Sequence, residues 1–121
     1  MATAITPKNL TDSSYAGENM TDATFDDITS GTGVDFNFVD ADMVMLYNDH
    51  ASASRVFTIT IPIPADSVLA DTNSDPADKT YTVPAKKYWP VPLADAMNDS
   101  NGKVTIDCDD TDCKIRAYKV V

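Results

Sequence analysis

The stretch KVTIDCDDTDCKIRA, residues 103–117, alternates apolar and polar side chains on both sides of a short acidic segment. Because successive side chains of a strand point to opposite faces, the apolar ones share one face of each predicted strand. They are Val104, Ile106 and Cys108 before the acidic segment, and Cys113, Ile115 and Ala117 after it. The pattern predicts an antiparallel hairpin with DDTD as its loop, in which Cys108 faces Cys113. Such a pairing would allow a disulfide between the two cysteines.

The acidic loop is also a candidate metal site. An EF-hand loop starting at Asp107 would need an acid at its fifth position and glycine at its sixth, where this chain has Thr111 and Asp112. A structural zinc site normally has four ligands, and only two thiols lie here. The metal alternative that stays open is a loose calcium site formed by Asp107, Asp109, Asp110 and Asp112. Otherwise we expect no metal and no cofactor.

The two cysteines are not expected to be a catalytic dithiol. Such pairs usually occur as Cys-x-x-Cys at the start of a helix, where the helix dipole lowers a thiol pKa. In this chain strands flank the pair, and the neighbouring side chains are carboxylates, which raise a thiol pKa. We therefore interpret the stretch as structural.

The same alternation continues outward over most of the chain. The segments GVDFNFV (33–39) and RVFTITIPI (55–63) alternate, whereas DMVMLYN (42–48) is apolar on both faces, as a central strand would be. Two segments that contain proline, KTYTVPA (79–85) and YWPVPL (88–93), are expected to be edge strands or bends. About seven or eight short strands separated by turns predict an all-β fold, a single β-sandwich or jelly-roll-like domain.

Trp89 lies in the second of the proline-rich segments. Tryptophan in a rigid segment suits an interface anchor, and we keep this role as a candidate. A strand bounded by prolines also suits a core residue, and of the two interpretations we favour the core.

The first thirty residues differ in composition from the remainder. They are rich in Thr, Asn, Asp and Ser, with isolated apolar residues, so they can hardly form a core alone. We interpret residues 1–30 as an extended N-terminal arm with the first connections, and assign the β-sandwich domain to residues 31–121. The arm is either a disordered tail or a segment that docks elsewhere.

Charge and motifs exclude several functions. The chain of 121 residues has a formal net charge of −10, and nucleic-acid binding requires a positive surface, so no nucleic-acid partner is expected. The sequence has no apolar run of about 18 residues and no apparent secretory signal, so no membrane partner is expected. His50, the single histidine, lies in a small polar loop without a Gly-x-Ser-x-Gly elbow, and we interpret it as a solvated loop residue. The protein is therefore predicted not to be an enzyme.

The order and spacing of these segments resemble the small β-rich head decoration, or cement, proteins of tailed bacteriophages. The resemblance extends from Ile5 onward. The segments that carry it are ITPKNLT (5–11), VMLYNDHASASRVFTITIP (44–62), KTYTVPAKKYWPVPL (79–93), NGKVTIDC (101–108) and CKIRAYKVV (113–121).

The resemblance implies a non-enzymatic protein of the virion. Proteins of this family bind the outer surface of the icosahedral capsid and stabilise the head after assembly in the host cytoplasm. The expected partners are the major capsid protein and further copies of the chain, as a homotrimer. On this interpretation the capsid-binding arm includes Ile5, Thr6, Pro7, Lys8 and Leu10.

Two other functions stay open. The first is a neck, tail or fibre component of a phage, present in few copies per particle. The second is a calcium-dependent β-sandwich module that binds carbohydrate or another surface, with the acidic loop as its ion site.

Overall fold

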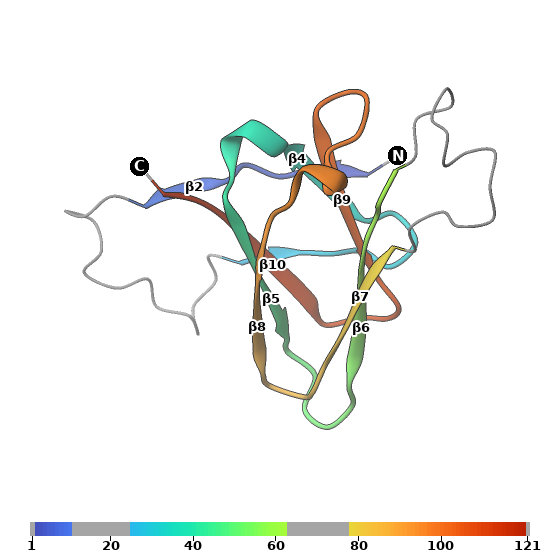
Figure 1. The fold of residues 1–121 in the computed structure, drawn as a ribbon. Coiled ribbons are helices and arrows are strands. Elements are labelled where there is room, and N and C mark those ends of the chain that lie inside the picture. Colours follow the sequence, from blue (N-terminus) through green and yellow to red (C-terminus); the bar gives the residue numbers. More distant parts are fainter. Residues whose placement is uncertain (1, 11–24, 63–77, 121) are drawn as a thin grey trace.

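Two β-sheets packed face to face form the protein (Figure 1). The computed structural model describes residues 2–10, 25–62 and 78–120. Sheet A has the strand order β1-β4-β9-β6-β7, and sheet B the order β2-β10-β5-β8, with β3 also paired to β10. The strands of sheet A are β1 (Thr3–Ala4), β4 (Val34–Asn37), β9 (Lys103–Cys108), β6 (Arg55–Ile59) and β7 (Lys79–Val83). Those of sheet B are β2 (Lys8–Leu10), β3 (Asp26–Asp27), β10 (Cys113–Val120), β5 (Met43–Asn48) and β8 (Tyr88–Pro92).

This architecture confirms the predicted all-β sandwich. The strands formed by the two proline-containing segments, β7 (followed directly by Pro84) and β8, lie at the ends of the two sheet orders, as expected for edge strands. Strand β5 lies between β10 and β8, as expected from its apolar residues on both faces. Two short 3₁₀ turns, η2 (Phe38–Asp40) and η4 (Asp95–Met97), are the helical elements of the described residues. No helix in the described part of the chain is long and apolar enough to span a membrane.

The core fills the space between the sheets. Alternate residues of β4, β6 and β9 point inward from sheet A, and alternate residues of β5, β8 and β10 point inward from sheet B. The inward side chains with less than 2% exposure include Val34, Phe36, Phe57, Ile59, Val104 and Ile106 from sheet A and Val44, Leu46 and Ile115 from sheet B. Burying these apolar side chains supplies the main favourable free energy of folding.

The predicted hairpin of residues 103–117 is wrong. Strands β9 and β10 belong to different sheets: β9 pairs with β4 and β6, whereas β10 pairs with β5, β2 and β3. The segment 109–112 is therefore an arch that crosses from sheet A to sheet B, and Asp112 adopts a left-handed φ of 65° in it. The predicted inward faces are nevertheless confirmed, because the six apolar residues assigned to them from the sequence are all buried.

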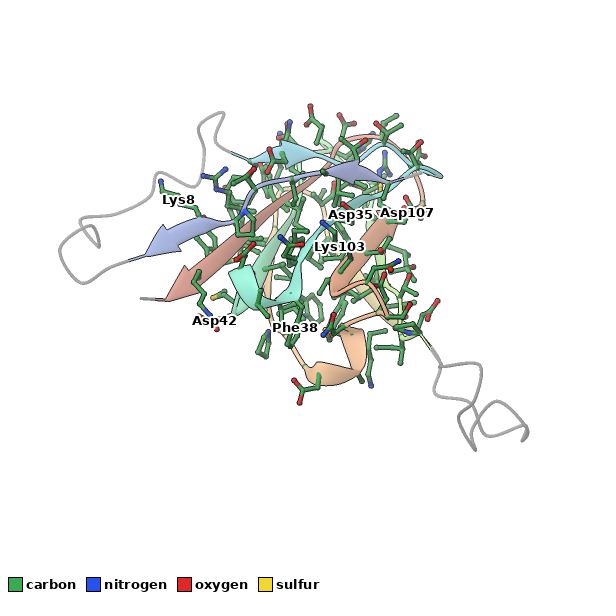
Figure 2. The ribbon with its side chains drawn as sticks, turned by 90° about the horizontal axis from the view of Figure 1, so that it is seen from above. Lys8, Asp35, Phe38, Asp42, Lys103 and Asp107 are labelled. Atoms are coloured by element: carbon green, nitrogen blue, oxygen red, sulfur yellow. The ribbon has the colours of Figure 1, made fainter. Side chains whose placement is uncertain are left out.

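The N-terminal segment joins both sheets. Strand β1 pairs in parallel with β4, and the Thr3 and Ile5 amides donate to the carbonyls of Gly33 and Asp35 at 3.0 and 2.9 Å. Strand β2 pairs in parallel with β10. Seen from above, the segment runs across the top of the molecule, with Lys8 near one end and Asp107 near the other (Figure 2). The two sheets thus include strands from the region that we assigned to the arm.

Candidate interaction surface and the cysteine arch

The two cysteine thiols meet inside the arch. Cys108 ends β9, Cys113 begins β10, and both side chains are buried and free. Their sulfur atoms converge on one acceptor, the backbone carbonyl of Asp110, at 3.1 and 3.4 Å. The thiols also hydrogen-bond to each other, which lowers the pKa of Cys108 and raises that of Cys113. The disulfide considered from the sequence is therefore not formed in this structure, although its two partners lie together.

Arg55 fixes the arch from sheet A. This buried residue begins β6, and its Nε donates to the Thr111 carbonyl at 2.6 Å. Its Nη1 donates to the carbonyl of Ser54 at 3.1 Å, and its Nη2 lies 4.0 Å from the carboxylate of Asp110. Sequence reasoning missed this role. The signal in the sequence was a single cation, Arg55, at the start of an alternating apolar strand.

Asp107 of β9 and the three acidic residues of the arch do not form one group. Asp107 accepts hydrogen bonds from the Gly31 and Cys108 amides at 3.1 and 2.8 Å, and Asp109 accepts one from the Val56 amide at 3.0 Å. These two carboxylates are therefore engaged by different segments of backbone.

The other two acidic residues bond within the arch. Asp110 accepts from the Thr111 amide at 2.7 Å, and Asp112 from the Thr111 hydroxyl at 3.4 Å. In the described ranges no group of three or more His, Cys, Asp or Glu side chains is arranged to hold a metal ion. The structure thus does not bring the four candidate calcium ligands together.

His50 and Asn48 organise the loop after β5. The Nδ1 atom of His50 accepts hydrogen bonds from the Ser52 and Ala53 amides at 3.0 and 2.8 Å, so this ring stabilises the turn. The fully buried Asn48 side chain donates to the carbonyls of Ala53 and Val83, and accepts from the His50 amide. Sequence reasoning did not single out Asn48, because a polar residue at the end of an apolar strand reads as the start of a turn.

The predicted arm residues lie in the connection between β1 and β2 and on β2 itself. Ile5 packs against the core, Thr6 is exposed, and Pro7 and Lys8 are half-buried. Leu10 pairs through its backbone with Val120 at the end of β10. Backbone pairing therefore attaches this segment to the edge of sheet B in the isolated chain.

The outward surface of sheet B, here called the B face, carries an apolar patch. Its residues are Met43, Met45 and Tyr47 of β5, and Pro92, Pro90 and Tyr88 opposite them on β8. The prolines are exposed and the other four residues half-buried. The rings of Tyr47 and Tyr88 stack with centroids 4.3 Å apart, and the ring of Phe25 meets that of Tyr47 edge-on at 5.9 Å.

Two cations border this patch on β10. Lys114 lies opposite Tyr47, and Arg116 opposite Met45. Lys114 forms an ion pair with Asp27 at 2.6 Å. The B face is thus an apolar patch with a charged margin, in which Lys114 and Arg116 of β10 lie near Asp27 and Asp26 of β3.

The outward surface of sheet A, here called the A face, is mostly polar. Its residues are Asp35, Asn37, Val56, Thr58, Thr80, Thr82, Lys103, Thr105 and Asp107. The two faces of the sandwich therefore differ strongly in polarity. Sequence analysis could have found the B face in DMVMLYN, whose outward row is as apolar as its inward row.

Trp89 is not a buried core residue. It lies on the inward row of β8 with the buried Val91, but its side chain is 41% exposed because β8 is an edge strand. Its ring meets that of Tyr81, on the edge strand of sheet A, edge-on with centroids 5.7 Å apart. The interpretation as a core residue is wrong, and the role of interface anchor stays a prediction.

No protein-family model matches the chain, and searches of curated proteins and of solved structures found no significant match.

Proposed function

We propose that this protein is a non-enzymatic structural protein of the virion. It binds the outer surface of the icosahedral head of a tailed bacteriophage, contacts the major capsid protein and stabilises the shell. The order of segments in the sequence suggested this function, and the contrast between the two faces of the sandwich supports it most directly.

The B face suits a protein partner. Methionine side chains are flexible and adapt to an uneven surface, whereas Pro90 and Pro92 are rigid and lose little entropy on contact. The stacked Tyr47 and Tyr88 add aromatic area of the kind that is enriched at interfaces. The A face offers mainly threonine and charged groups, which suits solvent. We therefore assign the B face to the capsid and the A face to the outside.

The N-terminal segment extends the same surface. Strand β2 belongs to sheet B and pairs with β10, so the proposed arm and the B face lie on one sheet. A short strand attached by backbone pairing adds contacts at a capsid with a small ordering cost. Thr6 and Lys8 are the arm residues that we expect to contact the shell or a neighbouring copy in a homotrimer.

The single histidine and the four aspartates considered as candidate site residues have structural partners. The ring of His50 holds a turn, and each acidic residue of the arch accepts a hydrogen bond. This distribution supports a binding role. The negative net charge supports an outer layer, because like charges keep particles dispersed.

The first test is quantitative peptide mass mapping of purified particles from the source, with copy number measured against the major shell protein. Copies close to stoichiometric with the shell would support decoration. A handful of copies per particle would move the protein to the neck, tail or fibre. Its absence from particles would overturn the viral proposal.

A further inference from the structure

We propose that Cys108 and Cys113 form an oxidisable dithiol that closes a disulfide between the two sheets when the folded protein meets a hydroperoxide. The two residues end β9 of sheet A and begin β10 of sheet B. A bond between them would therefore join the two layers of the sandwich directly. This inference does not depend on the proposed function.

The arch holds the two sulfur atoms in place before any oxidation. Both lie within hydrogen-bonding distance of the Asp110 carbonyl, and the thiols hydrogen-bond to each other. Arg55 secures the next residue through the Thr111 carbonyl at 2.6 Å. Forming a disulfide thus requires little movement of the backbone, and the carbonyl that loses its thiol donors belongs to an exposed residue.

Cys108 is the thiol that reacts first. Its hydrogen bond from Cys113 lowers its pKa, whereas the nearby Asp107 and Asp109 oppose this shift, and Cys113 has a raised pKa. Cys108 is also 6% exposed and Cys113 only 1%. The covering arch, residues 109–112, is itself exposed, so a molecule as small as hydrogen peroxide needs only a local opening.

The chemistry balances with hydrogen peroxide as the two-electron oxidant. The Cys108 thiolate attacks one peroxide oxygen, breaks the O–O bond and becomes a sulfenic acid, and the hydroxide that leaves is protonated to water. The Cys113 sulfur then attacks the sulfenic sulfur, forms the S–S bond and releases a second water. In sum, two thiols and one peroxide give one disulfide and two water molecules.

The bond would stabilise the sandwich. Closing even this short loop reduces the entropy of the unfolded chain, which corresponds to a rise in Tm of about 5–10 °C for a protein of this size. Thiol–disulfide exchange with dithiothreitol would reverse the gain.

The test uses the full folded chain. The protein is treated with hydrogen peroxide, quenched with catalase, denatured in N-ethylmaleimide and mapped by peptide mass, which also separates methionine oxidation from cysteine oxidation. We expect one peptide pair linked through the two cysteines, no maleimide on either, and a Tm raised relative to protein treated with dithiothreitol. The variants Cys108→Ser and Cys113→Ser, treated alike, should show no peroxide-dependent rise.

Three results would overturn the proposal. The first is maleimide labelling of both thiols after peroxide treatment. The second is a sulfinic acid on one cysteine with maleimide on the other, and the third is a disulfide that joins two molecules. An intramolecular disulfide without a rise in Tm would equally contradict the inference that the bond stabilises the pairing of the two sheets.

Discussion

The side-chain amide of Asn48 donates a hydrogen bond to the backbone carbonyl of Val83 at 2.9 Å, and so joins sheet B to sheet A inside the sandwich. The same amide reaches the Ala53 carbonyl at 2.8 Å, and its oxygen accepts from the His50 amide at 2.9 Å. One buried polar side chain therefore connects the end of β5, the loop after it and the end of β7.

Replacing this residue should be costly. Asn48→Ala would leave three backbone groups without their partner in a buried site, and we expect a loss of about 2–4 kcal/mol in the free energy of unfolding. Chemical denaturation measures the change. The matched control is Asn37→Ala, because the Asn37 amide is exposed and donates to the Asp40 carboxylate, at 3.0 Å, rather than to buried backbone. A similar loss in both variants would contradict the connecting role of Asn48.

Gly33 should tolerate a side chain less well than Gly102. Both have φ of +74°, so alanine at either site adopts a left-handed conformation that costs about 1–2 kcal/mol. At Gly33 the new Cβ would also lie 2.9 Å from the Ile106 carbonyl oxygen, whereas at Gly102 nothing lies within 4 Å. We expect Gly33→Ala to lose at least about 1 kcal/mol more than Gly102→Ala in denaturant unfolding. Equal losses would show that β4 moves away from β9 at no cost.

Arg55 should stabilise the arch through hydrogen bonds rather than through its charge pair. Arg55→Met keeps the apolar stem but removes the donor to Thr111, and we expect a loss of about 1–3 kcal/mol in the free energy of unfolding. Asp110→Asn removes the ion pair with Arg55, in which the atoms are 4.0 Å apart and the carboxylate is 61% exposed. This variant should change the free energy of unfolding by less than about 0.5 kcal/mol. The reverse order would indicate that the ion pair dominates.

Asp26 should destabilise the folded protein at neutral pH. Burial raises its pKa above the usual 3.8, and the positive charge of Arg116 only partly opposes this shift. The folded state then binds the proton more readily than the unfolded state, so its stability falls as pH rises through the shifted pKa. We expect Asp26→Asn to raise Tm at pH 7, and the difference to vanish below about pH 3, where both states are protonated.

Asp27→Asn is the control for this pH effect. Asp27 is 78% exposed and pairs with Lys114, so its amide variant should not raise Tm at neutral pH. If Asp26→Asn lowers Tm at pH 7, attraction between Asp26 and Arg116 outweighs the cost of burial.

The proposed capsid contact should be sensitive to charge on one face only. Met45→Glu places a carboxylate in the middle of the apolar B face, and we expect at least a tenfold loss of occupancy on purified expanded heads. Thr82→Glu adds the same charge at an exposed position of the A face and should leave occupancy unchanged. Tm measurements on both variants separate a binding defect from misfolding. Loss of binding with Thr82→Glu alone would reverse the proposed orientation.

Local patterns of the sequence predicted the strands and the side chains that each strand buries. The alternation around Phe57 and Ile106 identified strands and their inward faces, because the geometry of a strand sends neighbouring side chains to opposite sides whatever it pairs with. Proline in the segments around Val83 and Trp89 identified edge strands, because a residue without an amide hydrogen cannot complete a ladder.

Which strands pair with one another depended on the whole chain. The same alternation of Cys108 and Cys113 fits a hairpin within one sheet or an arch between two, since both arrangements bury the same side chains. The arch was selected by contacts far away in sequence, the pairing of β9 with β4 and β6, and the capture of Thr111 by Arg55. No local pattern contains that information.

The sequence by itself therefore determined an acidic all-β protein, the faces of its strands and the position of its two proline-rich edges, because these follow from composition and period. Tertiary structure alone decided that the cysteines meet across two sheets, that Asn48 joins those sheets, and that Met45 lies within the apolar B face. Such relations arise from which strands lie side by side, and many residues distant in sequence settle that choice together.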